Sequence, residues 1–105
     1  MPQFTVYENI NEKSKETYPF LLDVQNDLLE GLNTRVVIPM CTSSVIGGGS
    51  ISNLSPKFKI QGIPYTLLTP QLAGIAASDL GPSICSLSDY RTEIIKALDF
   101  LFTGF

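Results

Sequence analysis

The chain has no histidine among its 105 residues. Histidine is the usual general base at neutral pH and the commonest metal ligand in proteins. Its absence excludes a Ser-His-Asp or Cys-His catalytic arrangement built from this chain alone. A zinc site would have only two cysteines and the carboxylates as ligands. We therefore expect no metal site and no cofactor.

Positive charge and long apolar runs are also scarce. Seven Lys and Arg residues stand against ten Asp and Glu residues, for a formal net charge of −3. Nonspecific nucleic-acid binding depends on cations that neutralise phosphates, so direct binding to DNA or RNA is disfavoured. A membrane-spanning helix needs a run of about 18 apolar residues, and the sequence contains none. The N-terminal stretch MPQFTVYENINEK lacks the apolar core of a signal peptide. We expect a cytoplasmic protein without membrane contact, in which Cys41 and Cys85 stay reduced.

The residues that are present fit a single domain covering residues 1–105, with 44% hydrophobic side chains available for a core. Before residue 87 the chain consists mainly of short β-like runs between turn-forming residues. The first run, QFTVYE, alternates and predicts a half-buried strand. We expect Pro39 to end or bulge a later one, and residues 74–82 to form a short strand or an irregular crossing. The predicted runs are QFTVYE, YPFLLDVQ, TRVVIPM, and KFKI with PYTLL as a hairpin around QGIP.

The hydrophobic period changes after Leu87. Apolar residues then recur every three to four positions, which predicts one face of a helix. These residues are Tyr90, Ile94, Leu98 and Leu101. Five or six short strands followed by one helix predict a mainly β protein, an antiparallel barrel or curled sheet with a C-terminal α-helix.

The ends and the second face of this helix also carry signals. Ser86 and Ser88 are candidate N-caps, and Gly104 stands where a glycine would end the helix. Ile95 and Phe102 lie on a second apolar face that docking on one sheet does not require. This surplus predicts an interface with a partner or with a second copy of the chain.

Three further features allow a chemical and a structural interpretation. Asp23, Asp27 and Glu30 could hold Mg²⁺ or act in acid–base chemistry, or they could be solvated residues at a strand end and turn. Arg35 and Arg91 could stabilise an anion or form ion pairs. The triple glycine at residues 47–49 indicates a flexible loop rather than a phosphate-binding loop, because no Lys-Ser/Thr follows it.

Four stretches together resemble the CcdB family, the toxins of toxin–antitoxin modules that poison DNA gyrase. They are QFTVY at the N-terminus, LLDVQNDLLE, TRVVIP, and LSDYRTEIIKALDFLFTGF at the C-terminus. The resemblance implies an SH3-like barrel with a C-terminal helix, assembled as a homodimer whose helices meet near the dimer axis. It also implies that the toxin binds the gyrase A subunit, traps gyrase on cleaved DNA without catalysing a reaction itself, and is neutralised by a CcdA-like antitoxin.

The resemblance assigns roles to particular residues. The gyrase-binding residues would be Leu28 and Leu29, with Asp99, Phe102, Thr103, Gly104 and Phe105 at the C-terminus. The dimer interface would include Ile95 and Phe102. Thr103 departs from the best-known member, which has a tryptophan at this position.

Two alternative functions remain open at this point. An mRNA endoribonuclease of the MazF or Kid type has a related barrel, and Arg35 with a nearby carboxylate would then act on RNA. A degenerate, non-toxic relative that still binds an antitoxin would fit the threonine at position 103.

Overall fold

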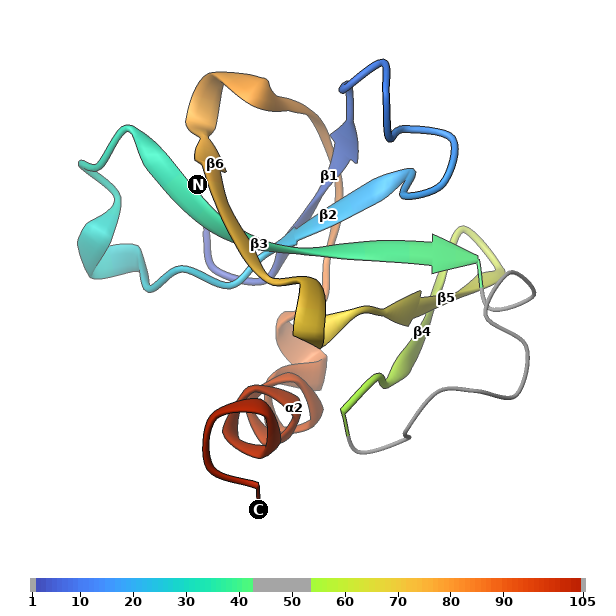
Figure 1. Ribbon diagram of the computed structural model, residues 1–105, viewed down its shortest axis with the longest axis vertical. Coiled ribbons are helices and arrows are strands. Elements are labelled where there is room, and N and C mark those ends of the chain that lie inside the picture. Colours follow the sequence, from blue (N-terminus) through green and yellow to red (C-terminus); the bar gives the residue numbers. More distant parts are fainter. Residues whose placement is uncertain (1, 43–53, 105) are drawn as a thin grey trace.

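The computed structural model describes residues 2–42 and 54–104, and the triple glycine lies outside them. Within these ranges the chain forms seven strands and one α-helix (Figure 1). The elements are β1 (Thr5–Asn9), β2 (Phe20–Asp23), β3 (Thr34–Thr42), β4 (Lys57–Ile60), β5 (Ile63–Leu67), β6 (Ala73–Ala76), β7 (Leu80–Ser86) and α2 (Arg91–Thr103). The described part of the chain contains no helix that is both long and apolar enough to cross a membrane.

All seven strands belong to one antiparallel sheet that curls into a half-barrel (Figure 1). The strand order is β4-β5-β3-β2-β1-β7, and β6 pairs with the first half of β3. The predicted class, mainly β with a C-terminal helix, is confirmed. The number of strands was underestimated because β7 has the sequence LGPSICS, whose Gly, Pro and Ser residues are poor strand signals. Pairing with β1, interrupted by two register shifts, makes this segment a strand.

The prediction that Pro39 ends or bulges its strand is wrong. β3 continues through Pro39 to Thr42, and Pro39 pairs with Leu21 in the regular register of β2 and β3. Pro39 lies where β3 changes its partner on the other edge, after Val37 has paired with β6 and before Met40 pairs with β5. Its carbonyl accepts a hydrogen bond from the Leu68 N–H at 2.9 Å. Proline has no backbone N–H to donate. At residue 39 this missing donor falls between the part of β3 that pairs with β6 and the part that pairs with β5, so the sheet accommodates proline there.

The predicted hairpin between β4 and β5 is confirmed, with a shorter turn. Only Gln61 and Gly62 lie between the strands, and both have positive φ angles, 54° and 81°. This is the backbone of a type I′ turn, whose twist matches that of the flanking strands. Ile63 and Pro64 therefore belong to β5.

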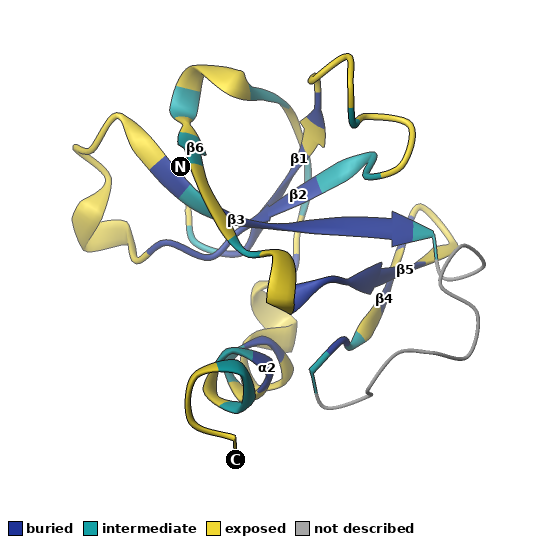
Figure 2. Ribbon diagram, viewed as in Figure 1, coloured by how far each residue is buried: buried dark blue, intermediate teal, exposed yellow. Residues whose placement is uncertain are grey.

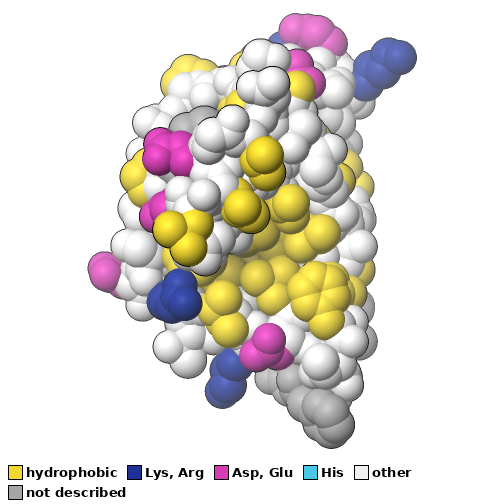
Figure 3. Space-filling model, turned by 90° about the vertical axis from the view of Figure 1, so that its left-hand side faces the viewer, with side chains coloured by type: hydrophobic (Ala, Val, Ile, Leu, Met, Phe, Trp, Pro, Cys, Tyr) yellow, Lys and Arg dark blue, Asp and Glu magenta, His cyan; other side chains and the backbone are white. Residues whose placement is uncertain are grey.

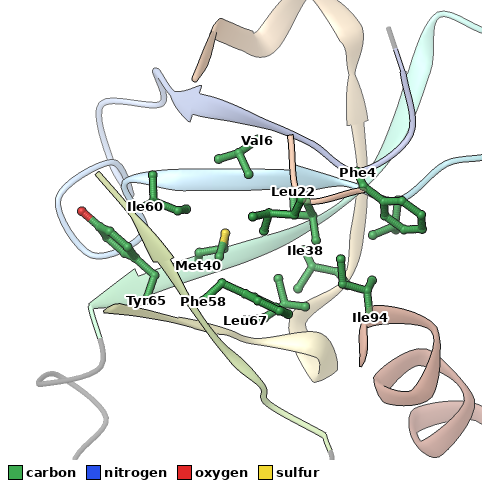
Figure 4. Packing of buried hydrophobic residues seen from close by; sticks show 12 residues of the cluster. Phe4, Val6, Leu22, Ile38, Met40, Phe58, Ile60, Tyr65, Leu67 and Ile94 are labelled. Atoms are coloured by element: carbon green, nitrogen blue, oxygen red, sulfur yellow. The ribbon is translucent and has the colours of Figure 1, made fainter. Parts of the chain in front are cut away.

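The core lies between one face of the sheet and α2 (Figure 4). Ile94 and Ala97 of α2 are fully buried against it. The sheet contributes the larger set of core side chains, which includes Val6, Leu22, Ile38, Met40, Phe58, Ile60, Tyr65 and Leu67.

The opposite face of the sheet is also covered, so β1 is not half-buried as its alternation predicts. Tyr7 and Leu21 point to this second face, and both are buried. β6 and the 3₁₀ turn that follows it cross over this face, leaving a pocket of about 270 Å³ whose lining includes Leu21, Ile75 and Asp79. The crossing segment had no clear sequence signal, which is why the burial of the second face was missed.

The end of α2 was predicted correctly and its beginning was not. Gly104 caps the helix in the left-handed conformation, with φ 82°, and its N–H donates to the Phe100 carbonyl at 2.9 Å. Neither predicted serine caps α2, because a 3₁₀ turn at Ser88–Tyr90 comes first and α2 begins at Arg91. The Ser86 hydroxyl instead accepts a hydrogen bond from the Ser88 N–H at 3.2 Å.

We predict that Gly81→Ala destabilises the protein strongly. A Cβ at this position would lie 2.7 Å from the Glu8 carbonyl oxygen and 2.7 Å from Cγ2 of Ile10, so β1 and β7 would have to separate. The expected loss is about 1–3 kcal/mol in the free energy of unfolding, measured by urea denaturation. Gly31→Ala is the control, because a Cβ added at Gly31 would meet no atom within 4 Å. Equal stability of the two variants would contradict the close approach.

Candidate partner-binding surfaces

The centre of the candidate site is a buried ion pair between neighbouring strands. Asp23 of β2 and Arg35 of β3 are both fully buried. The Arg35 Nε donates to Asp23 Oδ2 at 2.8 Å, and Nη2 lies 2.7 Å from the same oxygen. Tyr7 of β1 lies close enough for the Asp23 charge to raise the pKa of its phenol, although burial is the larger cause.

This pair corrects two interpretations of the sequence. Asp23 is not a solvated residue at a strand end, because its carboxylate neutralises the Arg35 charge inside the protein. Arg35 is equally inaccessible, so it could not contact RNA as the endoribonuclease hypothesis requires. Among residues 2–42 and 54–104, no group of three or more acidic or cysteine side chains is arranged to hold a metal ion.

The ion pair continues into a network of polar side chains that shapes the next turn. Asp23 Oδ1 accepts a hydrogen bond from the Gln25 N–H at 3.0 Å. The Asn26 side chain accepts from the Leu28 N–H at 2.8 Å, which caps the 3₁₀ turn at Asp27–Leu29. Asp27 in turn accepts from the Gln3 N–H at 2.6 Å. Asp27 therefore has a structural partner, as Asp23 does.

The turn held in this way displays three leucines, which we call the leucine turn: Leu28, Leu29 and Leu32. Their exposed fractions are 92%, 48% and 53%. Figure 2 shows this segment as an exposed projection beyond the buried part of β3. Leu28 and Leu29 were predicted as binding residues, whereas Leu32 was missed. Isolated exposed leucines are common, but three within five residues form a patch that can bind a partner.

The C-terminal end of α2 forms a second exposed surface, which we call the helix end: Asp99, Phe102, Thr103 and Gly104. Phe102 is 68% exposed. The Thr103 hydroxyl donates to the Asp99 carbonyl at 2.7 Å, so it closes the last helical turn. Gly104 then turns the chain away from the helix axis. Phe105, the last predicted binding residue, lies outside the described residues.

Only part of the α2 face that was predicted to be surplus to docking is exposed. Ile95 is half-buried and packs against the core of its own chain, as does Leu98. Tyr90, predicted to dock, is 46% exposed, and its ring centroid lies 5.1 Å from that of the core residue Phe58. The docked face is therefore centred on Ile94 and Ala97, and the largest unused apolar surface on the helix is Phe102.

The leucine turn and the helix end lie apart on one chain. In Figure 1 the turn before β3 projects from one side of the half-barrel, whereas the C-terminus lies at the bottom beyond α2. Figure 3 shows hydrophobic side chains gathered on the left-hand side of the molecule as drawn in Figure 1, the side from which the leucine turn projects. β6 adds to this apolar character, since Ala73 and Ala76 are exposed. The leucine turn and the helix end are thus two exposed surfaces at different places on the described part of the chain.

We predict that Asp23→Asn destabilises the protein far more than loss of an exposed ion pair. The substitution would remove the carboxylate charge that pairs with the buried Arg35, at an expected cost of about 3–5 kcal/mol in unfolding free energy. The control is Glu12→Gln, which removes the exposed ion pair to Lys15 at 3.1 Å and should cost less than about 1 kcal/mol. Chemical denaturation of both variants measures the difference. Similar losses would mean that the buried pair does not support the sheet.

Comparison with known protein families agrees with the resemblance seen in the sequence. A family model described as CcdB protein matches residues 3–104. The match spans every strand and the helix described above, and it includes the leucine turn and the helix end as far as Gly104. The chain therefore belongs to the CcdB family, the gyrase-poisoning toxins of toxin–antitoxin modules.

Proposed function

We propose that the protein binds the gyrase A subunit through the leucine turn and the helix end and traps gyrase on cleaved DNA. The observation that carries this proposal is the membership of the CcdB family, together with exposed apolar side chains at the positions that the resemblance assigns to gyrase. The protein would act in the cytoplasm by binding alone, while gyrase performs the chemistry.

The physical state of Leu28 and Phe102 supports a binding role. Both side chains are mostly exposed, so a partner could bury nearly all of their apolar surface. Burying one side chain of this size contributes about 1.5–3 kcal/mol. Leu28 sits on a turn capped by Asn26, and Phe102 sits in the last turn of a helix closed by Gly104. Ordered surfaces lose less conformational entropy on binding, so more of this energy remains as affinity.

We further propose that the protein is a homodimer whose contact is formed by the face of α2 that carries Ile95 and Phe102. The exposed Phe102 and the remaining exposed part of Ile95 would contribute to this contact. A two-fold axis repeats every surface of one chain on the other. The dimer would therefore present two leucine turns and two helix ends to a single partner.

A CcdA-like antitoxin is the second proposed partner. A disordered segment can cover a large surface at modest affinity per unit area, so it could contact apolar patches that lie apart on the folded chain. Neutralisation would follow if the segment covered the leucine turn or the helix end.

We predict that the purified protein, mixed with gyrase, DNA and ATP, produces linear DNA covalently linked to gyrase. Deleting Gly104 and Phe105, or replacing Leu28 with Ala, should reduce this product at least tenfold, because each change removes a proposed contact. Ile63→Ala is the matched control, since Ile63 is an apolar residue 50% exposed on β5, away from both surfaces. The control should retain full activity.

The proposal fails if no cleaved complex forms, or if the tail deletion and Ile63→Ala behave alike. Expression without an antitoxin in a gyrase-sensitive host, followed by growth measurement, separates a toxin from a non-toxic relative. Growth arrest that disappears in a gyrase-mutant host supports the proposed function, whereas normal growth in both hosts contradicts it.

We predict a dimer by light scattering after size exclusion. The expected mass is twice the 11.5 kDa of one chain. Phe102→Asp should shift the equilibrium towards the monomer, because it would place a charge within an apolar contact. The exposed substitution Ile63→Asp should leave the mass unchanged. A wild-type monomer at micromolar concentration would contradict the homodimer.

A further inference from the structure

We propose that Gln25 is the positioning residue of the leucine turn and so sets the affinity for gyrase without contacting gyrase. This inference rests on the proposed function. Gln25 is only 6% exposed, so a partner could touch little of it. Any effect of Gln25 on binding must therefore pass through the residues that it holds.

The Leu29 carbonyl is the point at which Gln25 acts on the turn. Gln25 Nε2 donates a hydrogen bond to this oxygen at 3.1 Å. The Leu32 N–H donates to the same oxygen at 3.1 Å. One carbonyl therefore joins the buried glutamine to two of the three exposed leucines.

The other end of the Gln25 side chain is anchored in the sheet. Its Oε1 accepts a hydrogen bond from the Val36 N–H in β3 at 3.0 Å. Its own backbone N–H donates to Asp23 of the buried ion pair at 3.0 Å. Gln25 thus connects the buried ion pair and β3 to the leucine turn at Leu29.

Of the common residues of this length, only glutamine suits both contacts. The Val36 N–H requires an acceptor and the Leu29 carbonyl requires a donor, and a side-chain amide supplies both. An ionised glutamate keeps the acceptor but turns a second oxygen towards the carbonyl. Methionine keeps the approximate shape and loses both hydrogen bonds. These two substitutions separate the effect of charge from the effect of the lost clamp.

The first test measures the free protein. Backbone amide hydrogen exchange should become faster at residues 28–32 in Gln25→Glu and Gln25→Met, while exchange in α2 stays unchanged. Gln61→Glu, which makes the same charge change on the exposed β4–β5 turn, should leave residues 28–32 as in the wild type. Unchanged exchange at residues 28–32 in both Gln25 variants would overturn the proposal.

The second test measures binding to the isolated gyrase A subunit in a double-mutant cycle. Each Gln25 variant should bind about 3- to 10-fold more weakly than the wild type, as expected for the loss of one or two hydrogen bonds that order a contact. The effect should shrink in a Leu28→Ala background, because Gln25 acts through the leucines. Gln61→Glu should bind normally. An equal loss in both backgrounds would overturn the positioning role.

The two tests keep the inference distinct from the proposed function. If Leu28→Ala alone binds as tightly as the wild type, the proposed gyrase contact of the leucine turn is wrong. The role of Gln25 in affinity is then wrong as well, whatever its exchange data show. If Leu28→Ala weakens binding but the Gln25 variants do not, the function stands and the positioning role is overturned.

Discussion

The buried ion pair between Asp23 and Arg35 is the constraint on which the proposed binding surface depends. A charge in the interior is tolerated only when it is paired, and these two side chains neutralise each other across neighbouring strands at 2.7 Å. The pair fixes β2 against β3 at the point where the chain leaves the sheet. Gln25, bonded to Asp23 through its backbone, then directs the chain into the leucine turn. Two of the three acidic residues for which a chemical role was one interpretation, Asp23 and Asp27, therefore have structural roles.

Around the leucine turn, polar side chains are buried and apolar side chains are exposed, which is the reverse of the usual arrangement. Asp23, Gln25 and Arg35 are buried, whereas Leu28 is almost completely exposed. Exposing a leucine side chain to water is unfavourable, and a partner that covered the leucine turn would remove this cost. α2 follows the same logic at its C-terminus, where Gly104 ends the helix shortly after the exposed Phe102. Display of ordered apolar side chains agrees with the proposed function, in which the protein binds and gyrase performs the chemistry.

Local signals in the sequence predicted the elements that local physics determines. Gly104 was identified as the helix end because only glycine readily adopts its φ of 82°. The β4–β5 hairpin was likewise predicted from its turn residues. Pro39 was misjudged because its fit depends on where β3 exchanges one partner strand for another, which no local pattern records.

The sequence proposed residues for the candidate site but did not predict the hydrogen bonds that support them. Leu28, Phe102 and Gly104 came from the family resemblance. The burial of Asp23 came from its pairing with Arg35, which lies 12 positions later and becomes a neighbour only when the sheet forms. Ile95 was assigned wholly to a surplus face because helix periodicity does not give the rotation of the helix on the sheet. Its half-burial reflects that rotation.

The most direct test of the proposed gyrase contacts is hydrogen exchange of the protein with and without the gyrase A subunit. We expect residues 26–32 and residues 99–104 both to gain protection in the complex, while the exposed β4–β5 turn does not. Protection confined to other parts of the chain would contradict the proposed contacts.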